Sequence, residues 1–329
     1  MKYFDLCLSL FLVSIIFISS CSEDEIINVP EVPKWELQYS ASEHLISVCF
    51  TDTNNGIAVG YYGAIIKTDD GGLTWKAQNS GTDLSLNDVF FSDANNGWIA
   101  GGTSTSYNSI ILHTTDGGTT WTQQWTGNRS VLYSVSFIDN NVGMAVGYRN
   151  TTGFDFEGFL LKTTNGGQDW EFQFSSTMRI FTGVSLSDIN IANVVDVGSG
   201  AFRTTNGGVT WNQQNIGITS PLWSVNYTDN DNGTIVGEFG EIIRTTNGGT
   251  NWVKQSSGIT ERLLDVSFID SSNGIAVGYQ GTILRTTNAG VTWVNQSLQS
   301  YEPFNGVSFV DTKNAWIVGA NGSIIKTKH

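Results

Sequence analysis

Cysteine, histidine and positive charge are all scarce in this sequence. Its 329 residues include three Cys, three His and 16 Lys or Arg against 30 Asp or Glu, so the formal net charge is −14. So few Cys and His leave no set of zinc ligands and no disulfide framework. The negative charge would repel nucleic-acid phosphates and anionic lipid headgroups. No glycine-rich nucleotide fingerprint stands between a strand and a helix, so we expect no metal, no cofactor and no nucleic-acid partner.

Long apolar runs are absent except at the N-terminus. Residues 6–20, LCLSLFLVSIIFISS, follow Lys2 and are too short for a confident membrane span, which is typical of a secretory leader. The tetrapeptide ISSC, which ends at Cys21, resembles a bacterial lipobox. That resemblance implies a lipoprotein signal peptide over residues 1–20 and acylation of Cys21; an ordinary secretory leader is the alternative. Cys49 is then the one free thiol, and its apolar neighbours indicate an inert core residue.

Residues 21–34 are predicted to form an acidic, flexible tether. They are polar at first and are then interrupted by Pro30 and Pro33. Residues 22–25, SEDE, resemble the export signal that sends some lipoproteins to the outer face of the outer membrane, and a solvated spacer is an equal alternative. We therefore expect an outer membrane lipoprotein that meets the membrane only through its lipid anchor. Periplasmic and cell-surface orientations both stay open.

The remainder of the chain repeats one pattern. Trp stands at positions 75, 121, 170, 211, 252 and 293, each after a Gly-rich turn such as the TTNGGVTW that ends at Trp211. A second series places Val four residues before Asp, as in LISVCF around Val48, while a third reads GIAVG and a fourth GTILRT. Each repeat thus holds four short strands rich in Val, Ile and aromatic residues and bounded by turn residues. Four strands per repeat of about 40 residues is typical of a propeller blade.

The two ends of the chain determine the number of blades. The Val series has seven members, yet the strand with Trp35 and Gln38 has no Gly-rich turn before it, and the C-terminal GSIIKTKH has no Trp strand after it. Pairing residues 35–38 with the C-terminal strands completes a seventh blade and removes an open sheet edge. We predict an all-β fold, a seven-bladed β-propeller of four-stranded antiparallel blades over residues 35–329.

The Gly-rich turn resembles the Asp-box, or bacterial neuraminidase repeat, S/T-x-D/N-x-G-x-T-W. In this interpretation the Asp or Asn side chain bonds the backbone two residues on, and Gly supplies positive φ. Trp fills space between blades, with its N–H satisfied nearby. None of these roles is catalytic, so we predict a structural role for the Asp-box residues. They are Asp70 and Trp75, Asp116 and Trp121, Asn165 and Trp170, Asn206 and Trp211, Asn247 and Trp252, and Asn288 and Trp293.

Among Asp-box propellers, the chain is similar to the family of photosystem II assembly and stability factors. The similarity covers residues 35–329 through the blade pattern G-[IMW]-A-V-G followed by G-x-I-[IL]-[KR]-T-T-x-G-G-x-T-W. It implies a non-enzymatic scaffold that holds protein partners, and it implies a basic patch. Nothing in the sequence points to a photosystem as the partner. The cations that precede the Asp-box Thr, one in each blade, are Lys67, His113, Lys162, Arg203, Arg244, Arg285 and Lys326.

This basic ring has two interpretations. It could bind an acidic partner through its positive charge. Alternatively, each cation could pair with the Asp or Asn turn beside it and with the many carboxylates of the chain. We favour the structural interpretation.

Two blades are longer than the others. From Val to the ring cation there are 19 residues in five blades, 24 in the second and 27 in the third. The extra length joins the second and third strands, on the face opposite the Asp-boxes, and we predict that residues 103–109 and 149–158 form a raised rim there. Insertions on one face often mark a binding face, with neutral drift as the alternative. The candidate binding rim is Tyr61, Tyr62, Tyr107, Arg149, Phe154, Phe156, Trp223, Phe239, Tyr279 and Tyr301.

Together these features predict a non-catalytic, lipid-anchored envelope propeller that acts as a protein-binding or assembly scaffold. The alternative is a carbohydrate-active enzyme, sialidase-like or another glycoside hydrolase, or a glycan-binding lectin. A sialidase needs an arginine triad, and no RIP-like segment precedes the repeats. Xyloglucan-cleaving enzymes pair two propellers, whereas this chain has one. The arginines outside the basic ring are Arg129, Arg149, Arg179 and Arg262.

Overall fold

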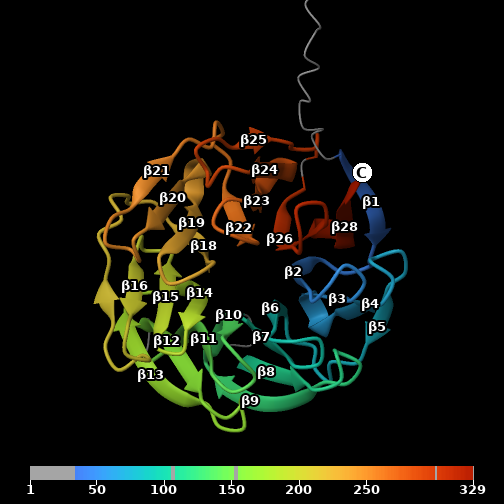
Figure 1. Ribbon diagram of the computed structural model, residues 1–329. Helices are drawn as coiled ribbons and strands as arrows, with labels where there is room; N and C mark the ends of the chain where they lie inside the picture. The colour runs from blue at the N-terminus through green and yellow to red at the C-terminus, as the bar shows by residue number, and fades with distance from the viewer. Residues whose placement is uncertain (1–33, 105–107, 152–154, 301, 329) are drawn as a thin grey trace, which may run out of the picture. The chain divides into compact units, whose positions relative to one another are not determined.

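A computed structural model describes residues 34–104, 108–151, 155–300 and 302–328. These residues form seven four-stranded antiparallel sheets, which follow one another from blue to red round a common centre in Figure 1. The helical segments among them are four short 3-10 turns, and none is long and apolar enough to cross a membrane. The predicted all-β, seven-bladed propeller is therefore confirmed. The predicted signal peptide and nearly all of the tether, with Cys21, lie outside the described residues.

Each blade begins at the centre of the ring with its Val-containing strand. Neighbouring inner strands contact one another all the way round, β26 against β2 included. In order of blades 1 to 7, the inner strands are β2 (Leu45–Phe50), β6 (Leu86–Phe91), β10 (Ser130–Phe137), β14 (Phe181–Asp188), β18 (Leu222–Tyr227), β22 (Leu263–Phe268) and β26 (Phe304–Phe309). The second strands are β3 (Gly56–Gly60), β7 (Gly97–Thr103), β11 (Gly143–Asn150), β15 (Ile191–Asp196), β19 (Asn232–Gly237), β23 (Gly274–Gly278) and β27 (Ala315–Gly319).

The other two strands of each blade lie progressively farther from the centre. The third strands are β4 (Ile65–Thr68), β8 (Asn108–Thr114), β12 (Phe156–Thr163), β16 (Ala201–Thr204), β20 (Ile242–Thr246), β24 (Thr282–Thr286) and β28 (Ser323–Lys328). The outer strands are β5 (Lys76–Gln78), β9 (Thr122–Asn128), β13 (Glu171–Thr177), β17 (Asn212–Gln213), β21 (Val253–Gln255), β25 (Val294–Asn295) and β1 (Lys34–Ser40). The 3-10 turns follow the second strands of blades 1, 5, 6 and 7 and are η1 (Tyr61–Gly63), η2 (Glu238–Gly240), η3 (Tyr279–Gly281) and η4 (Ala320–Gly322).

The hydrophobic core lies between the blades. One cluster of buried apolar side chains fills each interface between neighbouring blades in the described part of the chain. Between blades 7 and 1, Phe50 stacks on Trp316 with ring centroids 3.7 Å apart and meets the Asp-box Trp75 edge-on at 5.9 Å. Every residue of β3 is buried because both faces of a middle strand are covered. This two-sided burial explains why such strands read as continuous apolar runs rather than as alternating ones.

The first Gly of the GIAVG pattern has a packing reason. In five blades the aromatic ring near the end of the inner strand lies over a Gly at the start of the second strand, whereas blades 4 and 7 have Ala192 and Ala315 at that position. A Cβ atom at Gly56 would lie 2.5 Å from the Phe50 ring, and one at Gly274 would lie 2.4 Å from the Phe268 ring. Any larger residue there would displace the ring from the interface between blades.

The N-terminal strand closes the ring as predicted. β1 pairs antiparallel with β28, with Trp35 opposite Thr327 and Leu37 opposite Ile325. Figure 1 shows the blue β1 beside the red β28. Trp35 packs into the cluster between blades 6 and 7, and its indole N–H donates to Gln296 Oε1 at 3.0 Å. Trp35 therefore occupies the place that the Asp-box Trp has in the other blades.

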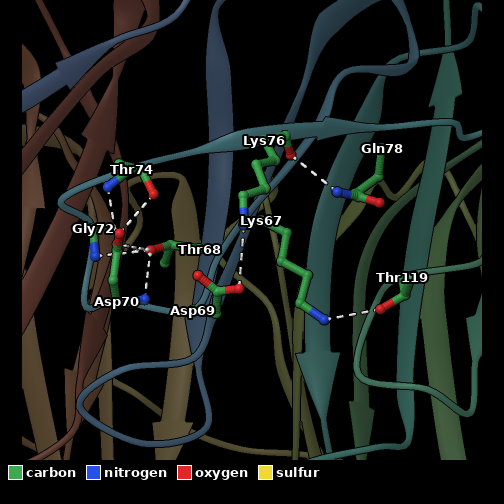
Figure 2. A network of polar contacts seen from close by, with 9 residues as sticks. All are labelled: Lys67, Thr68, Asp69, Asp70, Gly72, Thr74, Lys76, Gln78 and Thr119. Atoms are coloured by element: carbon green, nitrogen blue, oxygen red, sulfur yellow. Dashed lines mark hydrogen bonds and ion pairs between the residues drawn. The ribbon is translucent and has the colours of Figure 1, made fainter.

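The Asp-box turn is held by side-chain bonds to its own backbone (Figure 2). Thr68 Oγ1 donates to Asp70 Oδ1 at 2.8 Å and accepts the Gly72 N–H at 2.9 Å. Asp70 accepts the Thr74 hydroxyl at 2.6 Å and the Thr74 N–H at 2.9 Å, and these bonds lower the pKa of Asp70 to about 2. The acceptor thus bonds the backbone four residues on, not two as expected. Gly71 and Gly72 both have positive φ, 72° and 91°, which lets the chain fold round the carboxylate.

The expectation that each Asp-box indole N–H is satisfied is wrong for four of the blades. Trp293 donates to Gln255 Oε1 and Trp121 donates to the Gly118 carbonyl, both at 3.1 Å. Among the Asp-box tryptophans, the buried indole nitrogens without a protein partner are those of Trp75, Trp170, Trp211 and Trp252. These side chains therefore stabilise the interfaces by packing rather than by hydrogen bonding.

We expect Trp35→Ala to lower the free energy of unfolding by about 2 kcal/mol, because it removes the indole from a core cluster together with its bond to Gln296. Leu37→Ala is the matched control in the same strand. Its side chain is 65% exposed, so the loss stays within about 0.5 kcal/mol. Urea unfolding followed by circular dichroism measures both. Equal losses would show that ring closure does not depend on Trp35.

Candidate functional site

The two faces of the propeller carry different connections. On the Asp-box face, the turn of each Asp-box meets the hairpin between inner and second strands, as where the Gly71 N–H donates to the Asn54 carbonyl at 2.9 Å. The opposite face, here called the rim face, carries the connections between second and third strands. It also carries the starts of the inner strands, as where the Tyr61 N–H donates to the His44 carbonyl at 3.0 Å. The candidate rim residues that the structure describes therefore lie on the same face as the starts of the inner strands.

The two insertions lengthen strands more than they form loops. In blade 2, β7 and β8 stay paired as far as Thr103 and Asn108, and in blade 3, β11 and β12 stay paired as far as Asn150 and Phe156. Residues 105–107 and 152–154, at the ends of these hairpins, lie outside the described residues. The described part of the predicted rim consists mostly of paired strand residues, and whether the rim is raised stays a prediction. Extended β-strands hold their side chains in a more fixed arrangement than a loop would.

A cavity of about 460 Å³ lies on the rim face where the inner strands begin. Every inner strand contributes to its lining through one or both of the residues that precede its repeat Val. Each of these strands is irregular at this point, as shown in β2 by the shift of register between Leu45 and Ser47. Such bulges re-aim side chains, which lets two consecutive residues, such as Ile46 and Ser47, face one cavity.

The residues directly before each Val form a belt round the ring, which is polar in five blades and Gly in the other two. The belt consists of Ser47, Asp88, Ser134, Gly183, Ser224, Asp265 and Gly306. Asp88 accepts the N–H of Val135 on the next inner strand at 2.9 Å, and Asp265 accepts the N–H of Val307 at 2.9 Å. In both cases the belt Ser of the preceding blade donates to the same carboxylate at 2.9 Å. Each belt Asp therefore joins three consecutive blades.

The two belt carboxyls have unusual ionisation. Burial raises the pKa of Asp88 to about 6 and that of Asp265 to about 7, against the hydrogen bonds they accept, and the charge of Asp88 further raises the pKa of Asp265. No ion pair among the described residues includes either Asp, and no Lys, Arg or His lines the cavity. Sequence reasoning missed both residues. The signal was the position before the Val series, which reads S, D, S, G, S, D, G.

The candidate rim residues fall into groups of different placement. Two line the cavity, namely Tyr61 and Trp223. Tyr61 is also exposed on a 3-10 turn, and three further candidates are exposed on such turns, namely Tyr62 at 74%, Phe239 at 68% and Tyr279 at 42%. Two belong to the paired ends of blade 3, namely Arg149 and Phe156. Those outside the described residues are Tyr107, Phe154 and Tyr301.

Arginines on the rim face are paired with carboxylates. The guanidinium of Arg262 lies between the rings of Trp223 and Tyr279, 4.8 and 4.9 Å from their centroids, and forms an ion pair with Glu238. The other two pairs are Arg149 with Glu157 at 2.5 Å and Arg179 with Asp196 at 2.9 Å. Three of the four arginines outside the basic ring therefore have their charge already compensated.

Six of the seven members of the basic ring join their blade to the next. Arg244 donates to Thr234 Oγ1 at 2.8 Å in its own blade and to the Ser271 carbonyl in the next, and it lies over the Phe268 ring at 4.9 Å. Lysines do the same, as Lys162 donates to the Gly207 carbonyl of the next Asp-box at 2.6 Å. Other members that reach the next blade are Lys67, Arg203, Arg285 and Lys326.

These contacts differ in detail from the expected pairing with the neighbouring Asp or Asn turn. Their partners are mainly carbonyl oxygens of the following blade, and none of the ion pairs among the described residues includes a ring cation. His113 instead stacks on Trp98 with ring centroids 4.7 Å apart, and burial lowers the pKa of its imidazole. The Lys and Arg members of the ring therefore stabilise the interfaces between blades through hydrogen bonds to the next blade.

Cys49 borders the interface between blades 1 and 2. Burial raises the pKa of its thiol to about 12, so the thiolate that reacts as a nucleophile is not populated at neutral pH. Among the described residues no three Cys, His, Asp or Glu side chains gather as a metal site.

A profile of the family described as photosynthesis system II assembly factor YCF48 matches residues 27–129 and 254–329, more than half of the chain. The chain belongs to the YCF48 family. No curated relative matches it by sequence.

Solved structures of the family share the fold. A structure described as YCF48 bound to D1 peptide is 21% identical with a TM-score of 0.72, over 91% of this chain and 98% of that one. YCF48 from Cyanidioschyzon merolae is 18% identical with a TM-score of 0.70, over 89% and 98%. The GH74 xyloglucanase from Xanthomonas campestris is 12% identical with a TM-score of 0.65, over 89% of this chain but 53% of the enzyme. At these identities the likeness is one of propeller fold.

We expect Arg244→Met to lower the free energy of unfolding by about 2 kcal/mol, because a buried carbonyl and hydroxyl lose their donor. Lys76→Met removes the same charge from a side chain that is 66% exposed and leaves stability within about 0.5 kcal/mol. Chemical unfolding of the two variants side by side measures the difference. If Arg244→Met unfolded like Lys76→Met, the stabilising role of the ring would be refuted.

Proposed function

We propose that this propeller is a non-catalytic scaffold that holds a segment of a protein partner on the rim face, over the cavity. The observation that carries the proposal is the cavity itself, lined by all seven inner strands and by Tyr61, with further exposed aromatic side chains on the 3-10 turns of the same face. Aromatic rings contribute a large contact area with little loss of side-chain entropy, and they are enriched where proteins bind proteins.

Membership of the YCF48 family supports this proposal. The family is described as an assembly factor, and one solved relative is bound to a D1 peptide. We carry over to this chain the holding of a protein segment and not the identity of that segment. The rest of the argument comes from the chain itself, where the aromatic side chains and the cavity share one face.

A carbohydrate-active enzyme is the alternative, and the cavity carboxyls are the feature that could favour it. A glycoside hydrolase needs one carboxyl as acid and one as base or nucleophile, in environments that separate their pKa values. Asp88 and Asp265 instead have matching environments, each with a Ser from the preceding blade and a Val N–H from the following one. Carboxyls in matching environments are suited to the same role rather than to the separate roles of acid and base that hydrolysis requires. Compensation of Arg149, Arg179 and Arg262 by carboxylates also argues against a sialidase triad.

Photo-cross-linking tests which face of the propeller contacts the protein partner. We expect a benzoyl-phenylalanine placed at Tyr62 or Phe239, on the rim face, to cross-link an envelope protein in living cells. The same group at Leu73 or Val209 is the control, because these side chains are 74% and 78% exposed in Asp-box turns on the other face. One discrete product from the rim positions alone supports the scaffold. A glycan array run with the same protein covers the alternative: oligosaccharide binding or turnover without any protein product would overturn the proposal.

We further propose that Cys21 carries the lipid that holds the propeller at the bacterial envelope, with residues 22–34 as tether. The ISSC sequence after an apolar run supports this proposal. We expect radiolabelled palmitate to enter the wild-type protein and Cys49→Ser but not Cys21→Ser, since Cys49 is a thiol of the folded domain and serves as the matched control. Protease treatment of intact cells then separates a cell-surface from a periplasmic orientation. Equal labelling of Cys21→Ser would exclude the anchor.

A further inference from the structure

The cavity on the rim face holds two carboxyl groups, and no Lys, Arg or His is among the described residues that line it. Asp88 and Asp265 both line it, and each is partly accessible to solvent. The partners described above donate neutral hydrogen bonds: Ser hydroxyls and backbone N–H groups. Buried carboxylates without a positive partner are costly, and proteins ordinarily pair them. The belt thus places two acidic groups in the cavity that no cationic side chain among its described lining residues neutralises.

The walls above these carboxyls are aromatic. Tyr61, Tyr133 and Trp223 line the same cavity as the two Asp side chains. The face of an aromatic ring carries partial negative charge and attracts cations, most strongly when both are shielded from water. The volume of about 460 Å³ falls within the range of pockets that enclose small ligands. The cavity is large enough for the end of a long side chain, and its chemistry favours a positive one.

The charge discriminates between occupants. An anionic group would be repelled, and an apolar group would displace water from two carboxylates without replacing their solvation. An ammonium or guanidinium on an aliphatic stem matches the cavity in both respects, because the stem contacts the aromatic walls while the charge reaches the carboxylates. The raised pKa values of Asp88 and Asp265 agree with this complementarity, since a cation would favour their ionised forms.

We propose that the cavity receives a lysine or arginine side chain from the bound partner segment, with Asp88 and Asp265 as its counter-charges and the aromatic walls round its stem. This inference rests on the proposed function and names the chemistry of the segment. In this proposal, Trp223 and the aromatic side chains of the 3-10 turns contact the bound peptide segment. The belt carboxyls determine the position in the cavity of its positively charged residue.

The test is a selection from a library of random dodecapeptides against the full-length protein in detergent. We expect the recovered peptides to share one lysine or arginine. A synthetic peptide from the selection is then compared with a copy that has citrulline in place of arginine or acetyl-lysine in place of lysine. Loss of a buried charged partner predicts affinity reduced by about thirtyfold in isothermal titration calorimetry.

The matched variants come from the repeat itself. Asp88→Ser places at this position the residue found in three other blades of the belt, and Asp265→Ser does the same in blade 6. We expect each variant to bind the cationic peptide with about thirtyfold lower affinity and to bind the neutral copy with unchanged affinity. Asp83→Asn is the control, because it removes one charge from an exposed side chain just before β6. Circular dichroism and thermal unfolding verify that the variants fold.

Each outcome has a separate meaning. Selected peptides without a shared positive residue, or unchanged binding to both belt variants, would overturn the cationic inference and leave the protein-binding scaffold standing. Recovery of no peptide above background would count against both. Millimolar Ca²⁺ serves as a last probe: a rise in melting temperature with calcium that is lost in both belt variants would assign the cavity to a metal ion and overturn the inference.

Discussion

Packing of blade against blade is the interaction on which this fold depends. Each core cluster combines side chains from two neighbouring blades, so a single blade has no core of its own. A row of such blades would end in two uncovered apolar faces, and only closure into a ring covers both. The last interface needs a Trp that the C-terminal repeat lacks, and Trp35 supplies it from the other end of the chain. Ring closure is thus a requirement of the core.

The blades are joined at three distances from the centre. Near the outside, the Asp-box Trp of one blade packs against its neighbour, and Gln255 of blade 5 bonds both the indole of Trp293 and the Ala289 carbonyl of blade 6. Farther in, the basic ring reaches the carbonyls of the next blade. At the centre, the belt side chains accept N–H groups from the next inner strand. This innermost set lines the cavity on the rim face, so the contacts that join the blades and the proposed binding surface coincide there.

The sequence predicts most of this fold because its signals repeat. Seven Val strands, six Asp-box turns and the unpaired Trp35 determine the number of blades and the closing strand. The belt was harder to find because its side chains differ from blade to blade, so the position before Val shows no constant residue. Asp88 and Asp265 are far apart in the sequence, and only closure of the ring brings both carboxyls into one cavity. The bond from Asp70 to Thr74, rather than two residues on, likewise follows from the folded loop and not from residue type.

Departures from sevenfold symmetry make this face suitable for one partner. The extended strands of blades 2 and 3 lie on one side, while the rings of Trp223 and Tyr279 enclose Arg262 in blades 5 and 6, across the ring in Figure 1. Between these two sides the belt carries charge only at Asp88 and Asp265. A segment crossing the cavity would therefore meet the extended strands of blades 2 and 3, then the two carboxyls, then the aromatic rings that enclose the paired Arg262. Such an order gives the segment a direction, which a strictly repeating surface could not do.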